Sequence, residues 1–360
     1  MKIIHCADIH LDSKLAALSH NKAILRRQEI LNTFCNLISE ADKNGDGAVI
    51  VAGDLFESKF ASPSTKSALI NTFTAHQNVK IFILTGNHDE SAFDDGFIKR
   101  LPPNVKLFSE GINRFDIDGV SFVGADLTTV SREQLKDIKW TPENYNILIC
   151  HGDIGKNSFY GAIDLDMFFD KPIDYFALGH IHSYKKEGAG RGYAVYSGCL
   201  EPRGYDETGP KGFVWIDTSI LDRSKSIRFV PYATRQVYSI RLDISDCASA
   251  ADVIKKAASF IDGQSVTSLD LAEFYLTGEI NEDCVFTTDQ ISQSLKPLLF
   301  DVKVKDLTKV KIDIEKIKNE ISLKSQFVKT AEAKIKDAEL LNRVLRYGLN
   351  ALNGEEIDSL

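Results

Sequence analysis

The sequence has no paired cysteine motif, no long apolar run and no excess of positive charge. Its six cysteines are scattered without Cys-x-x-Cys spacing, which argues against both a structural zinc site and a disulfide framework. No apolar run approaches the roughly 20 residues of a membrane-spanning helix, and polar residues interrupt the start too early for a signal peptide. We therefore expect reduced, mostly buried thiols, a cytoplasmic location and no membrane association.

The size and the charge of the chain limit the classes of partner. At 360 residues, with 43% hydrophobic content, the chain is long enough for about two domains and a sizeable core. Its formal net charge of −8 provides no basic footprint. A long nucleic-acid contact would therefore need metal ions or a partner to supply positive charge.

Polar motifs follow apolar strand patterns at several points. In the clearest case, an amide, an imidazole and a carboxylate at 87–89 come just after the apolar run at 79–84. Function tends to lie on loops held by a rigid strand scaffold, although ordinary turn chemistry also produces such a string. The pattern recurs along the chain, because five of the eight histidines lie at predicted strand exits beside glycine or aspartate. This recurrence favours a functional role over ordinary turn chemistry.

Strand and helix patterns alternate over the first half of the chain. Apolar runs predict strands at 2–7, 48–52, 79–84, 146–150 and 174–178. Helical periodicity predicts helices at 23–41 and 64–76. Shorter patterns at 105–108, 114–117 and 120–123 suggest antiparallel strands on the same scaffold. This alternation is typical of an α/β sheet, whose ligands gather beyond the carboxyl ends of the strands.

The strand exits carry oxygen and nitrogen donors without thiolate. Their members are Asp8, His10, Asp54, Asn87, His151, His180 and His182. Side chains two apart on a strand point to one side, so the Asp8 and His10 pair and the His180 and His182 pair could each face one ion. Seven groups are too many for one ion, whereas two ions about 3.5 to 4 Å apart, bridged by one carboxylate, would use them all. Such a pair clamps a phosphate oxygen and lowers the pKa of a bridging water, and these donors suit Mn²⁺, with iron and zinc left open.

Five short motifs follow one another in a fixed order: Asp8-Ile9-His10, Gly53-Asp54, Gly86-Asn87-His88-Asp89, His151-Gly152 and Gly179-His180-Ile181-His182. This ordered series resembles the calcineurin-like metallophosphoesterase superfamily, and most of all its DNA-repair exonuclease branch, the SbcD-type nuclease subunit. The resemblance implies a metallophosphoesterase sandwich of two mixed sheets flanked by helices. It also implies an α+β capping domain and a helical C-terminal tail.

The resemblance further implies roles for single residues. One ion would be held by Asp8, His10, Asp54 and His182, and the other by Asp54, Asn87, His151 and His180. His88 would be catalytic near the leaving group, with Asp89 orienting it. A glycine-rich segment at 197–212 resembles the family's closing hairpin beside the metals, where Arg203 and Tyr205 could touch substrate phosphate. Plain turn chemistry is the equally weighted alternative for that segment.

Three regions are expected: a nuclease domain at 1–232, a capping domain at 233–311 and a helical tail at 312–360. Relatives of the SbcD type use the small domain to cap the nuclease and to help recognise DNA, and a stabilising appendage is the alternative. Between residues 301 and 346 the chain has 12 basic against 8 acidic residues. A basic amphipathic helix packs on its own protein or on a partner helix, and the family precedent favours a partner.

The sequence therefore predicts a two-metal phosphodiesterase that acts on DNA, as the exonuclease and endonuclease subunit of an SbcCD-type repair and recombination complex. The expected partners are DNA and an SMC-like ATPase of the SbcC type, and a homodimer is a further candidate assembly. The alternative is a metallophosphoesterase of a small substrate such as a nucleotide. A scaffold with a decayed site is disfavoured, because every ligand is present.

Overall fold

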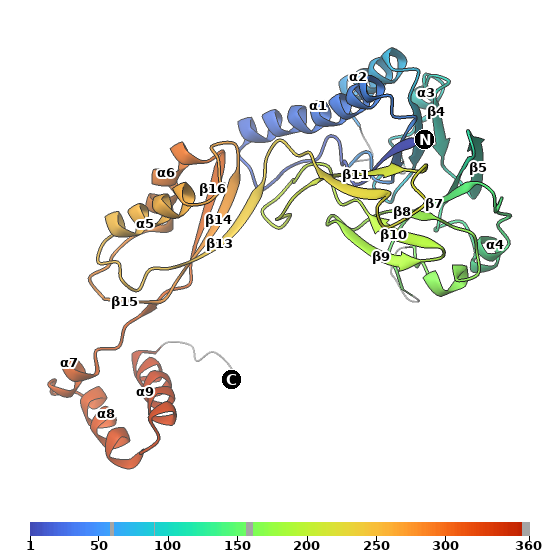
Figure 1. The fold of residues 1–360 in the computed structure, drawn as a ribbon. Helices are drawn as coiled ribbons and strands as arrows, with labels where there is room; N and C mark the ends of the chain where they lie inside the picture. The colour runs from blue at the N-terminus through green and yellow to red at the C-terminus, as the bar shows by residue number, and fades with distance from the viewer. Residues whose placement is uncertain (58–60, 90, 156–160, 355–360) are drawn as a thin grey trace. The chain divides into compact units, whose positions relative to one another are not determined.

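The computed structural model describes residues 1–57, 61–89, 91–155 and 161–354 (Figure 1). The chain divides into two compact units. The first unit comprises Met1–Ile240, Val266–Glu273 and Lys296–Lys303, and the second comprises Arg241–Ser265, Phe274–Leu295 and Val304–Leu360. This division into units does not test the predicted domain boundaries at 232 and 311, which stay predictions.

Two six-stranded mixed sheets form the first unit. The first sheet has the order β12-β11-β1-β2-β3-β4. Its strands are β1 (Lys2–Cys6), β2 (Ala48–Ala52), β3 (Lys80–Leu84), β4 (Val105–Phe108), β11 (Gly212–Asp217) and β12 (Ile227–Pro231). Strands β1 to β4 run parallel, while β11 is antiparallel to β1 and β12 is antiparallel to β11.

The second sheet has the order β5-β6-β7-β8-β10-β9. Its strands are β5 (Ile112–Ile117), β6 (Val120–Ala125), β7 (Tyr145–His151), β8 (Tyr175–Gly179), β9 (Lys185–Ala189) and β10 (Gly192–Tyr196). Strands β6, β7, β8 and β10 run parallel, and β5 and β9 pair antiparallel at the two edges. Two mixed sheets confirm the predicted architecture.

One prediction for this region is wrong. Strands β5 and β6 are antiparallel, as expected, but β4 pairs in parallel with β3 in the other sheet. The connections explain the difference, because parallel strands need a crossover whereas antiparallel ones need only a tight turn. Asp118 and Gly119, with φ of 48° and 74°, make the two-residue turn of a hairpin between β5 and β6. The chain between β3 and β4 instead includes the short helix α3 (Asp95–Ile98).

The alternation of side chains along the strands builds two cores in the first unit. One face of the first sheet packs against helices α1 (His20–Asn44) and α2 (Pro63–Ala75), with Phe34, Val51 and Phe73 in that core. The other face meets the second sheet, where the Phe82 and Phe122 rings stack with centroids 4.0 Å apart. The outer face of the second sheet is covered by helices α4 (Arg132–Lys136) and η1 (Leu165–Phe168).

The rest of the chain forms smaller elements. Strands β13 (Val237–Asp243), β14 (Leu271–Thr277) and β16 (Asp301–Asp306) form a three-stranded sheet through which the division between the units passes. Other elements are α5 (Ala250–Asp262), β15 (Glu279–Ile280), α6 (Thr288–Leu295), η2 (Lys296–Leu298) and β17 (Lys309–Val310). The tail forms helices α7 (Ile314–Lys318), α8 (Leu323–Lys334) and α9 (Ala338–Asn353).

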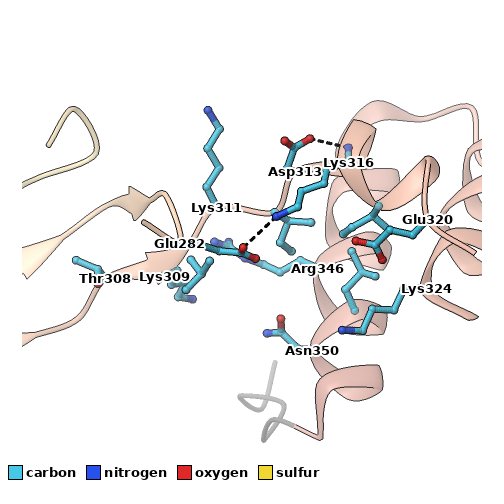
Figure 2. A pocket seen from close by; sticks show the side chains of 14 residues that line it. Glu282, Thr308, Lys309, Lys311, Asp313, Lys316, Glu320, Lys324, Arg346 and Asn350 are labelled. Atoms are coloured by element: carbon cyan, nitrogen blue, oxygen red, sulfur yellow. Dashed lines mark hydrogen bonds and ion pairs between the residues drawn. The ribbon is translucent and has the colours of Figure 1, made fainter. Parts of the chain in front are cut away.

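The tail helices have a small core of their own. Val328 and Ala331 of α8 pack with Leu345 and Leu349 of α9. A pocket of about 470 Å³ in the second unit is lined by Glu282, by β17 with the residues on either side of it, and by residues of the tail helices (Figure 2). Within the described part of the chain, no helix combines the length and the apolar character that crossing a membrane requires.

Candidate metal centre

Asp8 and His10 lie in the loop that follows β1. That strand ends at Cys6, and φ is 52° at Asp8 and 50° at His10. A left-handed backbone is uncommon outside glycine and must be held by its surroundings. Here the N–H of Asp8 donates to the Gly53 carbonyl at 3.1 Å and the N–H of His10 to the Asp54 carbonyl at 3.0 Å. The two side chains face one site because of this loop geometry, and not because of the strand alternation that the sequence suggests.

Asp54 lies between two imidazoles. Its Oδ2 is 3.7 Å from Nε2 of His10 and 3.3 Å from Nε2 of His151. Nε2 of His151 is also 3.1 Å from Oδ1 of Asn87. Nδ1 of His151 donates to the Ala52 carbonyl at 2.9 Å, so that the lone pair of Nε2 faces the site. One carboxylate oxygen of Asp54 thus lies between two imidazoles. A ligand that bridges two ions requires such an arrangement.

Asp8 belongs to two donor groups. One comprises Asp8, His10 and His182, and the other comprises Asp8, Asp54 and His151, with all donor atoms of a group within 4.8 Å of one another. A third group of the same kind comprises His10, Glu57 and His88. Nε2 of His10 and Nε2 of His182 are 3.2 Å apart. Together with the amide at position 87, the structure brings six of the seven predicted ligands to one place.

His180 lies at the rim of these groups. It follows the end of β8, with φ of 96°, and its N–H donates to Asp8 Oδ1 at 2.9 Å. Its ring centroid lies 5.3 Å from that of His151, while its Nε2 lies 3.7 Å from Oδ1 of Asp153. Its role as a ligand stays a prediction.

Two carboxylates orient imidazoles of the site. Nδ1 of His10 lies 2.7 Å from Oε2 of Glu57, and Nδ1 of His182 lies 2.7 Å from Oε1 of Glu207. The Nδ1 atom of His182 donates to Glu207, which directs the lone pair of its Nε2 into the site. Metal-ligating histidines almost always have such a partner on the other ring nitrogen, because it fixes the ring orientation and raises the basicity of the ligand.

Glu57 and Glu207 lie against imidazoles of the site, although the sequence motifs do not single them out. Glu57 ends the Gly-Asp-Leu-Phe-Glu string, three residues after Asp54. Glu207 lies in the glycine-rich segment, four residues after Arg203. The only signal in the sequence was an acidic residue inside each motif, with nothing local to indicate which imidazole it would meet.

The electrostatics of the centre favour positive charge. Burial would raise the pKa of Asp54, but the neighbouring His151 and His10 rings outweigh it and hold that pKa well below its usual range. Burial would likewise lower the pKa of His151, yet the Asp54 and Asp8 carboxylates raise it to about 9. A buried imidazole that gains affinity for a proton marks a strongly negative site, and such a site attracts metal cations.

The comparisons with known proteins agree with this geometry. Residues 1–184 match the calcineurin-like phosphoesterase family. The chain belongs to that family. Members use a dinuclear metal centre, and the two donor groups around Asp54 and Asp8 supply candidate residues for one.

Three curated relatives of this phosphoesterase have low identity to it. An uncharacterized metallophosphoesterase, YhaO, of Bacillus subtilis is 25% identical over 242 residues, which are 62% of this chain and 59% of the relative. The DNA double-strand break repair protein Mre11 of Aeropyrum pernix is 24% identical over 281 residues, 71% of this chain and 66% of the relative. Mre11 of Methanocaldococcus jannaschii is 26% identical over 278 residues, 71% and 73% of the two chains. The chain thus spans about three fifths to two thirds of the length of the first two relatives.

Glycines allow the donor loops of the phosphoesterase to approach closely. A Cβ at Gly53 would lie 2.1 Å from Nδ1 of His151, and a Cβ at Gly86 would lie 2.2 Å from Oδ1 of Asp54. Any side chain there would displace the ligands. The mixed oxygen and nitrogen donors, the carboxylate between two imidazoles and the oriented imidazoles therefore fit a pair of divalent ions.

His88 lies beside the donor groups with its ring 39% exposed, while its backbone N–H donates to Asp54 Oδ1 at 3.0 Å. The ring centroid lies 5.0 Å from that of His10, and its Nδ1 lies 3.4 Å from Oε1 of Glu57. The ring neighbour that the structure provides is therefore Glu57, where the sequence suggests Asp89.

Asp89 is buried and holds two donor loops together. Its carboxylate accepts N–H hydrogen bonds from Leu55 at 3.2 Å, Phe56 at 2.8 Å and Gly86 at 2.9 Å. Burial, and then repulsion from the Asp54 carboxylate, raises the pKa of Asp89 to about 7. In this structure Asp89 acts on the backbone of the loops after β2 and β3, and the orientation of His88 by Asp89 stays a prediction.

The two residues predicted to touch substrate differ in their surroundings. The Tyr205 hydroxyl donates to Asp301 Oδ2 at 2.6 Å, and the residue is 6% exposed and packs with Val237 and Leu271. Arg203 lies directly behind the His182 imidazole, with Nη2 3.2 Å from its Nδ1. Substrate contact stays a prediction for both, and each has internal partners.

Proposed function

We propose that this phosphoesterase is a two-metal phosphodiesterase of DNA and the nuclease subunit of an SbcCD-type repair complex. The observation that carries the proposal is the place of Asp54 Oδ2, 3.7 Å from Nε2 of His10 and 3.3 Å from Nε2 of His151. A carboxylate shared in this way suits two ions and a phosphoester substrate. DNA as the substrate rests on the Mre11 relatives, which are named as DNA double-strand break repair proteins.

The proposed ligands are those of the sequence motifs. Asp8, His10, Asp54 and His182 would hold one ion. Asp54, Asn87, His151 and His180 would hold the other. Their oxygen and nitrogen donors suit Mn²⁺, with iron and zinc as alternatives. When bound, such a pair supplies an activated water and neutralises charge on the phosphate.

His88 is the proposed general acid of the reaction. Its ring lies outside the two donor groups that contain Asp8, beside His10 and Glu57, and it is accessible from solvent. An accessible imidazole 5.0 Å from the ring of His10 can deliver a proton to a departing sugar oxygen on a phosphate held at the centre. Glu57 Oε1, 3.4 Å from Nδ1 of His88, would hold the protonated ring in place.

The tail is the proposed contact for an SMC-like ATPase of the SbcC type. Ile321, Leu323 and Leu340 are large apolar side chains that are exposed on or beside the tail helices. Lys309, Lys311 and other basic groups line the neighbouring pocket, where Lys316 pairs with Glu282 at 3.2 Å (Figure 2). Apolar anchors with a basic surround suit an amphipathic acidic helix of a partner. The same positive charge would offset the overall acidity of the chain near DNA.

Cleavage assays would test the proposal. Linear duplex DNA and free nucleotides are offered to the protein with Mn²⁺, with Mn²⁺ and a partner ATPase, and with EDTA. We expect metal-dependent cleavage of DNA, stimulated by the ATPase. Turnover of nucleotides but not of DNA under all conditions would favour the small-substrate alternative. An Asp95→Asn variant serves as the matched control, because Asp95 is an exposed carboxylate outside the donor groups.

A further inference from the structure

Arg203 joins two carboxylates behind the metal centre. Its Nη1 donates to Glu57 Oε2 at 2.5 Å, and its Nη2 donates to Glu207 Oε1 at 3.1 Å. Nε lies 3.3 Å from the same Glu207 oxygen, and the backbone N–H of Arg203 donates to Glu207 Oε2 at 2.7 Å. The side chain is 17% exposed, so these contacts are largely screened from water.

These carboxylates are the ones that orient two proposed ligands. Glu57 Oε2 lies 2.7 Å from Nδ1 of His10 as a close polar contact, and Glu207 Oε1 accepts a hydrogen bond from Nδ1 of His182 at 2.7 Å. A continuous chain of polar contacts therefore runs from one imidazole through Arg203 to the other. The Nε2 atoms at its two ends lie 3.2 Å apart, inside one donor group.

The arrangement needs an arginine for physical reasons. Two carboxylates brought close together and away from water repel each other, and burial adds to that cost. A planar guanidinium can bind both at once, whereas a lysine ammonium is a single point charge on a flexible stem.

We propose that Arg203 is a positioning residue, which acts through Glu57 and Glu207 to fix the His10 and His182 rings and so sets the metal affinity of the site that they share. This inference rests on the proposed two-metal centre but not on DNA as its substrate. It differs from the sequence hypothesis that Arg203 binds substrate phosphate, because the donors of its guanidinium are directed at the two carboxylates.

The segment that carries Arg203 has a second, independent anchor. Glu201 accepts from Arg26 Nη2 at 2.9 Å, from the Thr33 hydroxyl at 2.7 Å and from the Thr234 N–H at 2.7 Å. These contacts attach the start of the segment to helix α1. We therefore expect the segment to keep its place when the Arg203 side chain is shortened.

The test measures Mn²⁺ binding by the full chain at equilibrium, together with the thermal unfolding of the metal-free protein. Arg203→Gln should weaken binding at the site served by His10 and His182 by about 10- to 100-fold, the range typical for loss of an orienting partner. Binding at the other site should change little, and the unfolding temperature of the metal-free protein should stay near that of wild type. Arg203→Lys should restore only part of the affinity.

Controls separate the two proposed roles of the residue. Arg100→Gln removes an exposed arginine outside the site and should leave binding unchanged. Because Arg203 is held to act through Glu57, the double variant of Arg203→Gln with Glu57→Gln should lose less affinity than the sum of the two single losses. Unchanged Mn²⁺ affinity with a raised KM for a phosphodiester would overturn the inference and return Arg203 to substrate binding. Absence of DNA cleavage by a wild type that binds Mn²⁺ would instead contradict the proposed function and leave the inference standing.

Discussion

Single residues at the centre have separable duties, because their side chains face different partners. Asp54 faces two imidazoles, Asp89 faces three backbone amides and Glu57 faces the His10 ring. All are acidic and lie within or next to the same two motifs. Two substitutions test the roles that the metal centre assigns to single residues.

Asp54→Ala should abolish phosphodiester cleavage and remove both ions. Its Oδ2 lies between the His10 and His151 imidazoles, which are proposed to bind different ions, so its loss should affect both. Metal stoichiometry, measured on the purified and still folded variant, checks this expectation. Retention of two full equivalents would refute the bridging role, and Asp95→Asn provides the control.

His88→Asn should keep both ions but lower the rate of DNA cleavage by about 10² to 10⁴, the usual worth of general acid catalysis. A nitrophenyl phosphodiester should lose much less, because its leaving group departs without a proton. Both rates and the metal content are measured on one variant. If His88 merely braces the loop of Asn87, metal content and both rates should fall together.

At the scale of structural elements, the loops that carry the proposed ligands can pack closely only because glycine lies where they touch. Gly86→Ala should displace Asp54, because the new Cβ would lie 2.2 Å from its Oδ1 and 2.5 Å from its backbone N. Overpacking of this kind typically costs about 1–3 kcal/mol of stability, and here it should also reduce metal content. Gly188→Ala is the matched control, since a Cβ there meets nothing within 4 Å. Normal metal content in the Gly86 variant would show that the loop can adjust.

Helix α1 is tied to the chain beyond β12 by Glu29, which accepts from Arg26 at 2.8 Å and from Arg235 at 2.6 Å. Burial would raise the pKa of Glu29, but these hydrogen bonds outweigh it and lower that pKa. A lowered folded-state pKa means that the stabilisation is present above the unfolded-state value of about 4.3 and is lost as the pH falls further.

Glu29→Gln should therefore lower the unfolding free energy at pH 7 by about 1.5–3 kcal/mol, the worth of a hydrogen bond to a charged group. The difference from wild type should shrink as the pH falls below about 4. Urea unfolding of the metal-free proteins at pH 7, 5 and 3.5 measures both effects. A constant difference across this range would show that the charge of Glu29 does not contribute, and Glu143→Gln, at an exposed position, is the control.

For the whole molecule, we expect catalysis and partner binding to be separable. Removing residues 315–360 should leave metal binding and basic phosphodiesterase activity intact, because no proposed ligand lies beyond His182. Coupling to a partner ATPase should be lost with the tail helices. Metal content, cleavage of a nitrophenyl phosphodiester and ATPase-stimulated DNA cleavage are compared in the full and truncated chains. Loss of metal from a truncated, folded protein would contradict this division.

The candidate donor residues and the strands of the two sheets can be predicted from the sequence, because the patterns that indicate them are local. An apolar run followed by a glycine and a polar group identifies a strand exit, and family motifs such as Gly-Asn-His-Asp are contiguous. The same locality explains why the antiparallel pairing predicted for β4 was wrong, since a short strand pattern does not indicate which strand it will pair with. The choice there depended on the crossover through α3, which is a property of the folded chain.

How the donor side chains are held depends on contacts between distant parts of the chain. Glu57 and Arg203 meet across 146 positions of sequence, and Glu207 meets His182 across 25. The side chains of Asp8 and His10 converge through left-handed backbone at positions that a strand pattern treats as extended. Hydrogen bonds between distant loops stabilise that backbone, and no short stretch of sequence contains both partners of such a bond.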